Sequence, residues 1–269
     1  MTKSIFSPKL ERAQNLPRPI AAVASDYPAG QSTRRHSHDR TQLIYAESGV
    51  MTVTTADGVW VIPPERAVWV PAGIEHEVRM MGAVRMCSLF IDPQAATAQP
   101  GSCTVVTVSP LLRELILHAV NLPELYDPAG PDGRLMGVIL DQMQSLHETP
   151  LHIVIPNDAR LRRITDVLLN DPSDNRSLEQ WATAAGASSR TLARLFLRET
   201  GLTFGAWRQQ ARLLKALEEL ALKKSVTEIA FDLGYESPSA FIAMFRRALG
   251  KSPGRYFQEP SASPPLGDT

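Results

Sequence analysis

Two stretches in the C-terminal half of this 269-residue chain repeat each other, and this repeat limits the fold more than any other feature. Residues 178–186 correspond to residues 226–234 at an offset of 48, and after one inserted residue the correspondence continues at an offset of 49. The matched pairs are Leu178/Val226, Ala182/Ala230, Gly186/Gly234, Leu192/Phe241, Phe196/Phe245, Arg198/Arg247, Gly201/Gly250, Gly205/Gly254 and Trp207/Tyr256. Chance does not explain agreement at so many positions, so the chain contains two copies of one small structural unit.

Each copy has the residue order of a helix, a tight turn and a second helix. A small residue, Ala182 or Ala230, lets the second helix cross closely, and the glycine four residues later permits the left-handed backbone that ends the first helix. Ser188 or Ser237 then caps the next helix. This order predicts a helix-turn-helix motif in each copy, joined by a long amphipathic helix over 204–222. An ordinary helical domain is the alternative.

Residues of about 158–257 resemble the DNA-binding domain of AraC/XylS-type transcriptional regulators. The resemblance is carried by the two helix-turn-helix stretches, by Ile229–Tyr235 (IAFDLGY) and by the closing GKSPGRYF at 250–257. It implies seven helices, two of which enter successive major grooves on one face of double-stranded DNA, with a rigid helix between them. It also implies a sequence-specific regulator of transcription and not an enzyme, with RNA polymerase as a further partner.

Helical spacing divides the second helix of each motif into an inward and an outward row. With their caps, the outward positions form the candidate DNA-binding set: Ser188, Ser189, Arg190 and Arg194 in the first motif, and Ser237, Ser239, Ile242, Arg246 and Arg247 in the second. Because arginine pairs bidentately with guanine, we expect Arg190 and Arg194 to read bases, with solvation or phosphate contacts as the alternative. The second helix has Ile242 and Ala243 on its outward side, and it either contacts thymine methyl groups through them or mainly holds the DNA backbone. Arg246 and Arg247 at its end are expected to contact phosphates.

The charge of the chain does not mark it as a polyanion-coating protein, because 28 basic residues balance 28 acidic ones. Residues 1–156 have 12 basic and 15 acidic side chains, a net charge of −3, and residues 157–269 have 16 and 13, a net charge of +3. Only two cysteines, Cys87 and Cys103, are present, which excludes a disulfide scaffold and fits a reducing compartment. With no membrane-length apolar run and no secretory signal, we expect a cytoplasmic protein without a membrane partner.

Residues 34–92 have the pattern of short β-strands. Apolar and polar residues alternate, with turn signals at Ser48–Gly49, Asp57–Gly58, Pro63–Pro64 and Pro71–Gly73. The pattern predicts an antiparallel sandwich or barrel, with a hairpin at Asp57–Gly58.

A helical pattern replaces the strand pattern from about residue 109. Ser109 and Pro110 begin one predicted helix. A second, over 134–147, has an apolar stripe that includes Leu135, Ile139, Met143 and Leu146. This second helix either covers the barrel or forms the interface of a homodimer. We place a linker near 148–157, a sensor and dimerisation domain at 1–152, a DNA-binding domain at 153–258 and a disordered tail at 259–269.

Three histidines and a glutamine are the candidate ligands of a metal ion. His36 and His38 share strand parity with Gln42, and His76 lies in a segment expected to pair across the sheet, so the four side chains are expected to converge. Neutral imidazoles suit zinc, nickel, iron or copper. The set predicts one transition metal, with a vestigial hydrogen-bonded cluster as the alternative.

The spacing of these four residues resembles the cupin pattern over about residues 30–92. The sequence departs from that pattern at Gln42, where a glutamate is usual, and at Met80, where an asparagine is usual. Both departures count against catalysis, so a cupin-type metalloenzyme with helical appendages is only the alternative function.

The expected fold class is α+β, with a cupin-like antiparallel β-barrel followed by an all-α domain that contains both helix-turn-helix motifs. Regulators that resemble this chain commonly place such a barrel before the DNA-binding half as a sensor, which implies a small-molecule effector. Tyr45, Trp60, Trp69 and Phe90 are candidate pocket residues or plain core.

Overall fold

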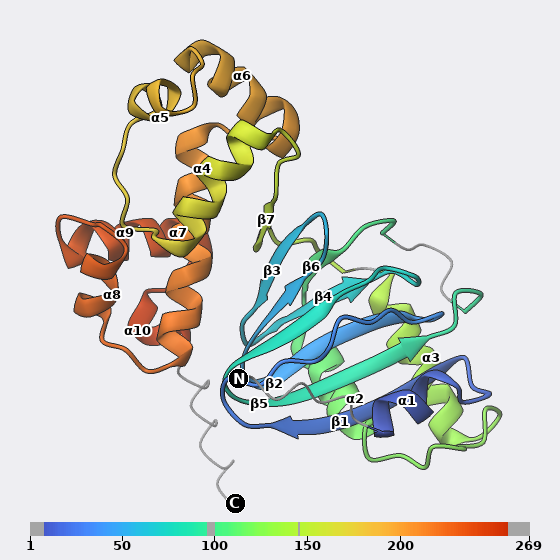
Figure 1. Cartoon of the computed structure of the whole chain (residues 1–269). Coiled ribbons are helices and arrows are strands. Elements are labelled where there is room, and N and C mark those ends of the chain that lie inside the picture. Colours follow the sequence, from blue (N-terminus) through green and yellow to red (C-terminus); the bar gives the residue numbers. More distant parts are fainter. Residues whose placement is uncertain (1–7, 96–99, 145, 258–269) are drawn as a thin grey trace, which may run out of the picture.

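The computed structural model describes residues 8–95, 100–144 and 146–257, and consists of a curved antiparallel sheet followed by a helical domain (Figure 1). The expected order, sheet first and helices second, is confirmed. The predicted disordered tail at 259–269 lies outside the described residues. Among the helices that the structure describes, none has the length and apolar composition needed to cross a membrane.

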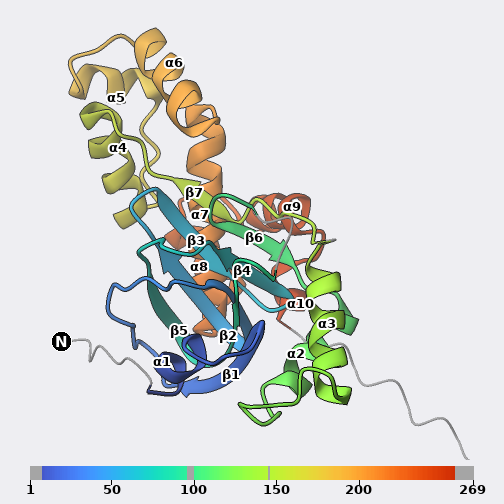
Figure 2. The ribbon, with the colours of Figure 1, turned by 90° about the vertical axis from the view of Figure 1, so that its right-hand side faces the viewer.

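Seven strands form one sheet in the described residues between 20 and 154, and we call this part the sheet domain. They are β1 (Ile20–Tyr27), β2 (Thr41–Thr54), β3 (Gly58–Ile62), β4 (Arg66–Val70), β5 (Glu77–Ile91), β6 (Thr104–Thr107) and β7 (His152–Val154). The strand order is β1-β5-β2-β3-β7, and β4 pairs with β2 and β6. Because β2 pairs with β4 along its first part and with β3 along its last part, the sheet curls around an apolar interior (Figure 2).

The turn at Asp57–Gly58 joins β2 to β3, as the sequence predicts. Thr54 lies opposite Val59, and the backbone N–H of Thr55 donates to the carbonyl of Gly58 at 3.0 Å. A Cβ on Gly58 would lie 2.5 Å from the carbonyl oxygen of Ile153 in β7, so the glycine allows β7 to approach the hairpin. The expected linker at 148–157 therefore includes a short strand that pairs with the sheet.

The two faces of the sheet bury two separate apolar clusters. On one face, β-strand residues such as Ile44 and Phe90 pack into the cluster that also contains Leu10 and Ala13 of α1 (Pro8–Gln14). On the other face, residues such as Leu43 and Leu89 pack beneath α2 (Pro110–Ala119) and α3 (Pro131–Met143). Both helices therefore serve as a cover of the sheet.

The structure corrects the bounds of the predicted helix at 134–147, but its apolar stripe packs as predicted, with Leu135 and Leu146 partly buried against the cluster that contains Ile139 and Met143. The helix α3 begins at Pro131, because proline is favoured in the first turn, and it ends at Met143. Of the four stripe residues, Ile139 and Met143 are buried within their own chain. The reading in which this helix covers the sheet is thus confirmed, whereas Val138, 42% exposed, is left on the outer side.

Seven helices form the helical domain over the described residues 159–256, as the family resemblance implies. They are α4 (Ala159–Asn170), α5 (Leu178–Ala184), α6 (Ser189–Thr200), α7 (Phe204–Ala221), α8 (Val226–Asp232), α9 (Pro238–Leu249) and α10 (Pro253–Tyr256). The pairs α5–α6 and α8–α9 are the two helix-turn-helix motifs, and α7 is the predicted joining helix. Its buried side includes Trp207 and Leu217, which are fully enclosed.

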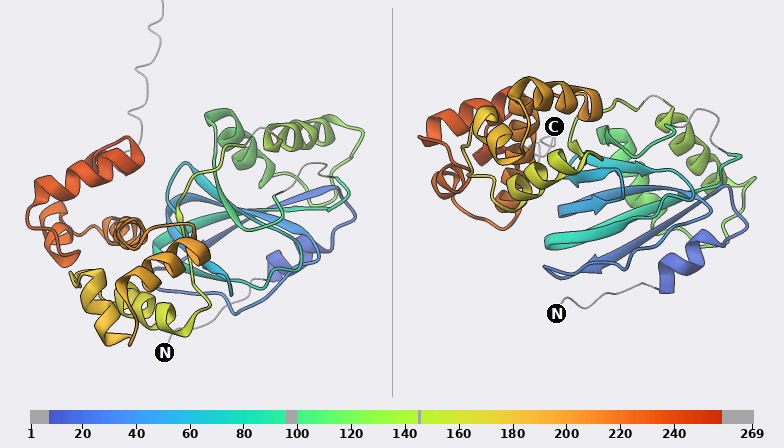
Figure 3. Two further views of the ribbon diagram at one scale, coloured as in Figure 1. Left: turned by 90° about the horizontal axis from the view of Figure 1, so that it is seen from above. Right: turned by 45° about the horizontal axis from the view of Figure 1, so that its top comes forward.

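The joining helix α7 also attaches the helical domain to the sheet domain, which lie side by side in both views of Figure 3. Nε1 of Trp207 donates to the carbonyl of Val154 in β7 at 3.1 Å. Farther along α7, the hydroxyl of Thr52 in β2 donates to the carboxylate of Glu218 at 3.0 Å. The helix on which both motifs are mounted is therefore held directly by the sheet.

Candidate DNA-reading helices and histidine cluster

The first helix-turn-helix motif is built by local signals that the sequence displays. Ser177 and Gln180 form a reciprocal capping box at the start of α5, and Gly186 has a φ of 62° in the turn. The hydroxyl of Ser188 then accepts from the backbone N–H of Thr191 at the start of α6. These caps fix the direction in which α6 leaves the turn.

The burial of α6 matches the predicted division into two rows. Leu192, Leu195 and Phe196 are buried, whereas Arg190 and Arg194 are exposed. Ser189 is half-buried, and the Ser188 hydroxyl is engaged as the helix cap.

The second motif repeats this construction with different outward chemistry. Ser237 caps α9 by accepting from the backbone N–H of Ala240, and Phe241 and Phe245 are fully buried. The residues predicted to face outward line one shallow hollow on the surface: Ser239, Ile242, Ala243, Arg246 and Arg247. An apolar floor flanked by two cations differs from the arginine row of α6.

The arginines of the two outward rows have no acidic partner in the described part of the chain, unlike some other arginines of the domain. Among the described residues, Arg190, Arg194, Arg246 and Arg247 form no ion pair with a carboxylate. In the same domain, Arg160 pairs with Asp158, Arg176 with Asp174 and Arg198 with Glu199. Cations without an acidic partner are thus present on the outward sides of α6 and α9, where a polyanion can neutralise them.

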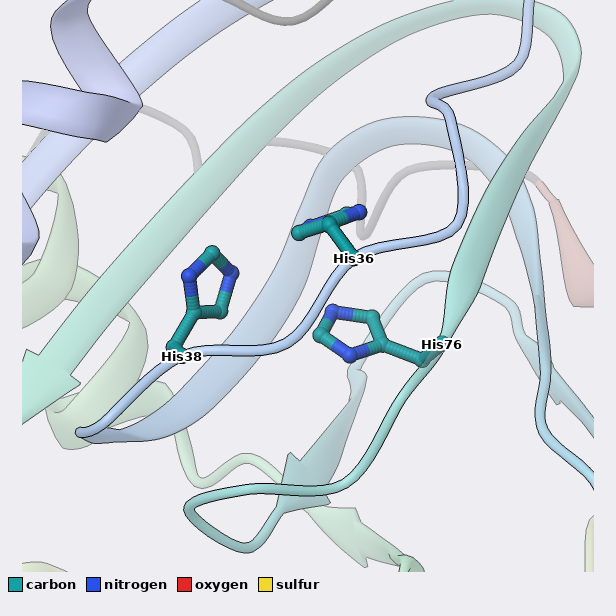
Figure 4. Close-up of side chains that lie close together, drawn as sticks. All are labelled: His36, His38 and His76. Atoms are coloured by element: carbon teal, nitrogen blue, oxygen red, sulfur yellow. The ribbon is translucent and has the colours of Figure 1, made fainter.

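The three histidines of the sheet domain converge, as predicted (Figure 4). His36 and His38 come from the segment before β2, and His76 precedes β5. The candidate ligand atoms of the three side chains all lie within 4.8 Å of one another. His36 and His38 are not on a regular strand; instead, isolated backbone bridges, from Ser32 to Arg79 and from His36 to His76, bring the two segments together.

Each imidazole of the cluster has a hydrogen bond at Nδ1 to an oxygen acceptor. Nδ1 of His36 lies 2.6 Å from the carbonyl of Arg34, and Nδ1 of His76 lies 2.9 Å from the carbonyl of Ile74. Nδ1 of His38 lies 2.7 Å from Oε1 of Gln14. Since each oxygen can only accept, each Nδ1 donates its proton, and in a neutral ring the lone pair is then on Nε2.

The Nε2 atoms have the surroundings of metal ligands. Nε2 of His38 is buried and has no hydrogen-bond partner, and the residue is only 5% exposed. Nε2 of His76 lies 3.2 Å from Oε1 of Gln42, so two acceptors face each other. A cation between such atoms would satisfy both, so the donor set fits a transition metal.

Burial keeps the imidazoles of the cluster neutral. Desolvation is the main cause that lowers the pKa of His38 to about 3 and that of His76 to about 4, and it also lowers the pKa of His36. Neutral imidazole is the form that binds a transition metal. Gln42 also donates to the hydroxyl of Ser88 at 3.0 Å, which fixes the amide against the cluster.

Sequence reasoning did not find Gln14, which supports His38 from α1. The glutamine lies 24 residues before the histidine and outside the cupin-like spacing, so no local pattern connects the two. Arg40 reinforces the same closure, because its guanidinium donates to the carbonyls of Leu16 and Arg18. The segment that follows α1 is thus tied down beside the histidine cluster.

The four candidate pocket residues fall into the two different apolar clusters. Trp60 and Phe90 belong to the cluster on the histidine side, and Phe90 contacts His38 with ring centroids 5.0 Å apart. Tyr45 and Trp69 belong to the cluster beneath α2 and α3. The four side chains therefore do not line one common pocket.

Comparison with known proteins accounts for both halves of the chain. Residues 20–129 match the family described as AraC-like ligand binding domain, and residues 181–259 match the one described as Helix-turn-helix domain. The chain is 38% identical over 221 residues to the HTH-type transcriptional regulator NimR of Escherichia coli (strain K12), which covers 82% of this chain and 81% of that protein. It is 35% identical to RipA of Corynebacterium glutamicum over 38% of this chain and 31% of that protein.

Among solved structures, ToxT from Vibrio cholerae covers 88% of this chain and 94% of its own, at 12% identity and a TM-score of 0.38, which adds nothing to the assignment. The sequence relatives are transcriptional regulators and not enzymes, which decides against the metalloenzyme alternative. The chain belongs to the AraC-type family of helix-turn-helix transcriptional regulators, with an N-terminal ligand-binding domain for a small-molecule effector and a C-terminal DNA-binding domain.

Proposed function

We propose that this regulator reads its operator unequally, with α6 recognising bases and α9 mainly holding the DNA backbone. The observation that carries the proposal is the contrast between the two outward rows. Arg190 and Arg194 are exposed one turn apart on α6, and each guanidinium can pair bidentately with guanine. The row of α9 offers an apolar side chain, Ile242, between Ser239 and the arginines at its end.

Base discrimination and backbone contact respond differently to substitution and salt. A bidentate arginine contributes about 1–3 kcal/mol of discrimination at its base pair. We therefore expect Arg194→Ala to relax specificity at one or two positions of one half-site. Arg247→Ala should weaken binding to all sequences alike and lower the salt slope by about one unit.

A binding-site selection on random duplexes at two salt concentrations tests these roles. It would compare the wild-type chain with Arg194→Ala, Arg247→Ala and Ile242→Ala, and use Arg79→Ala as a control, because Arg79 is an exposed arginine of the sheet domain. Ile242→Ala is expected to change the preferred sequence less than Arg194→Ala. The opposite order would show that the roles of the two helices are wrongly assigned, and no enriched sequence at all would refute sequence-specific reading.

We propose that the histidine cluster holds one transition metal through Nε2 of His36, His38 and His76, with Gln42 as an additional oxygen ligand. The ion would supply a Lewis-acidic centre to which an effector can bind. Two observations support this proposal. Each of the three Nδ1 atoms donates to an oxygen, which leaves the lone pair on Nε2, and the buried Nε2 of His38 has no hydrogen-bond partner. Separations of up to 4.8 Å between ligand atoms have to contract to about 3–4 Å around an ion with bonds of about 2.1 Å.

A measurement of the metal content per chain tests this second proposal. The purified protein is expected to hold up to one equivalent, and His38→Ala to lose it. His118→Ala is the matched control, because His118 is an exposed histidine on α2. A wild-type chain that takes up no zinc, nickel, iron or copper would leave the vestigial hydrogen-bonded cluster as the correct reading.

We propose a homodimer formed through the outer side of α2 and α3, where Leu111 and Val138 are 54% and 42% exposed. Sedimentation of the full chain and of Val138→Glu tests the dimer: a dimer that the substitution dissociates is expected, and a monomeric wild type would refute it.

Since DNA is the partner of this regulator, we propose the cytoplasm as its place of action and RNA polymerase at the regulated promoter as its further partner.

A further inference from the structure

Arg212 is a buried cation in the middle of α7, the helix that joins the two helix-turn-helix motifs. Only 8% of the residue is exposed, and burial lowers the pKa of its guanidinium. Its hydrogen bonds go to neutral acceptors: Nε donates to the carbonyl of Pro172 at 2.8 Å, and Nη2 donates to Oδ1 of Asn175 at 2.8 Å. A Coulombic interaction with Asp171 opposes this lowering of the pKa, but the two acceptors are neutral, and taking a cation out of water is costly.

The contacts of Arg212 reach both motifs. Pro172 and Asn175 belong to the loop that leads into α5, the first helix of the first motif. On the other side, the guanidinium carbon lies 5.3 Å from the ring centroid of Tyr235, which follows the turn of the second motif. Asn175 also connects the entry loop of the first motif to the turn of the second, because its Nδ2 donates to the carbonyl of Gly234 at 3.1 Å.

The turn glycines of the two motifs show where the motifs touch. Both have a left-handed backbone, with φ of 62° at Gly186 and 74° at Gly234. A Cβ added to Gly186 would meet nothing within 4 Å, whereas one added to Gly234 would lie 2.6 Å from the carbonyl oxygen of Ser173 and 3.1 Å from Nη2 of Arg212. The turn of the second motif is therefore packed against the entry loop of the first.

We propose that Arg212 and Asn175 are positioning residues that fix the angle and separation of α6 and α9, and so set the number of base pairs between the two halves of the operator. The proposal rests on the DNA reading proposed above, because it requires both helices to contact one duplex. A guanidinium suits the task, since its planar fork donates in two directions while its face packs on an aromatic ring. A lysine ammonium has no such fork.

Affinity as a function of operator spacing tests the proposal. The full chain would be bound to the duplex selected with the wild type, and to duplexes with one or two base pairs inserted or deleted between the halves. One base pair rotates the second half by about 35° around the duplex. The wild-type affinity is expected to fall by about tenfold or more for each such change. Asn175→Ala and Arg212→Met are expected to lose most of this preference, with less than about a tenfold loss at the original spacing.

Two further variants separate positioning from folding and charge. Asn170→Ala is the matched control, because Asn170 is an exposed asparagine whose Nδ2 bonds within α4, and it should keep the wild-type spacing preference. Arg212→Lys keeps the charge but not the fork, so it should behave like Arg212→Met. Asn175 is exposed, so its variant is expected to fold even where Arg212→Met does not.

An unchanged spacing preference in folded Asn175→Ala would overturn the proposal, and so would a wild type that tolerates every spacing. Loss of binding at all spacings by folded Asn175→Ala would also overturn it, because a positioning residue leaves the reading helices intact. Failure of the proposed DNA reading is distinguishable, since the selection would then yield no preferred duplex in the first place.

Discussion

Gly234→Ala and Gly186→Ala form a matched pair of substitutions whose costs differ for a structural reason. At each position, alanine in a left-handed backbone costs about 1–2 kcal/mol. Gly186→Ala has this cost alone, because its Cβ would meet nothing within 4 Å. At Gly234 the Cβ would also lie 2.6 Å from the carbonyl oxygen of Ser173 and 3.0 Å from its Cα, so the loop has to move. Overpacking of this kind costs about a further 1–3 kcal/mol.

We therefore expect Gly234→Ala to lower the free energy of unfolding of the helical domain by about 2–5 kcal/mol and Gly186→Ala by about 1–2 kcal/mol. Urea unfolding followed by helical circular dichroism measures both losses. The shift of the loop also strains the bonds from Arg212 to Pro172 and Asn175, so the larger loss should be accompanied by a weaker spacing preference on DNA. Equal losses for the two variants would refute the close contact between the motifs.

The remaining predictions concern the core, the histidine cluster and the domain contact. Leu192→Ala, at a fully buried position of α6, should cost about 2–5 kcal/mol of unfolding free energy, whereas Leu197→Ala, 56% exposed on the same helix, should cost less than about 0.5 kcal/mol in the same urea titration. Gln14→Leu should weaken metal binding by about 10–100-fold in a chelator competition, while Gln14→Glu, which keeps an acceptor for Nδ1 of His38, should not. Lys251→Ala removes an exposed ion pair with Glu65 between the domains and should shift the urea midpoint by less than the equivalent of about 1 kcal/mol.

The helical domain was predictable because its signals are local. The serine caps, the turn glycines and the inward rows are each visible within a dozen residues, and Ser188, Gly186 and Phe196 have the conformations or burial that these signals predict. The contacts between the motifs were not predictable. Asn175 and Gly234 are 59 residues apart, and nothing in either neighbourhood specifies the other.

The histidine cluster was predicted correctly for a reason that is partly wrong. Convergence of His36 and His38 was expected from strand parity, yet neither residue lies in a regular strand. Isolated bridges from Ser32 to Arg79 and from His36 to His76 produce the convergence instead, and isolated bridges leave no periodic signal in the sequence. The strand β7 was not predicted for a similar reason, because its three residues are too few to show an alternation of apolar and polar side chains.

The arrangement of the two domains limits how an effector can act on DNA binding. A ligand can shift an equilibrium only by as much as its affinities for the two states differ. His76 immediately precedes β5, which pairs with β2 along most of its length, and the contact of Thr52 with Glu218 connects β2 to α7. Binding at the histidine cluster that displaces either strand must therefore change contacts on the helix that connects both motifs. An effector that leaves β2 and β5 unmoved has no such route through these contacts, however tightly it binds.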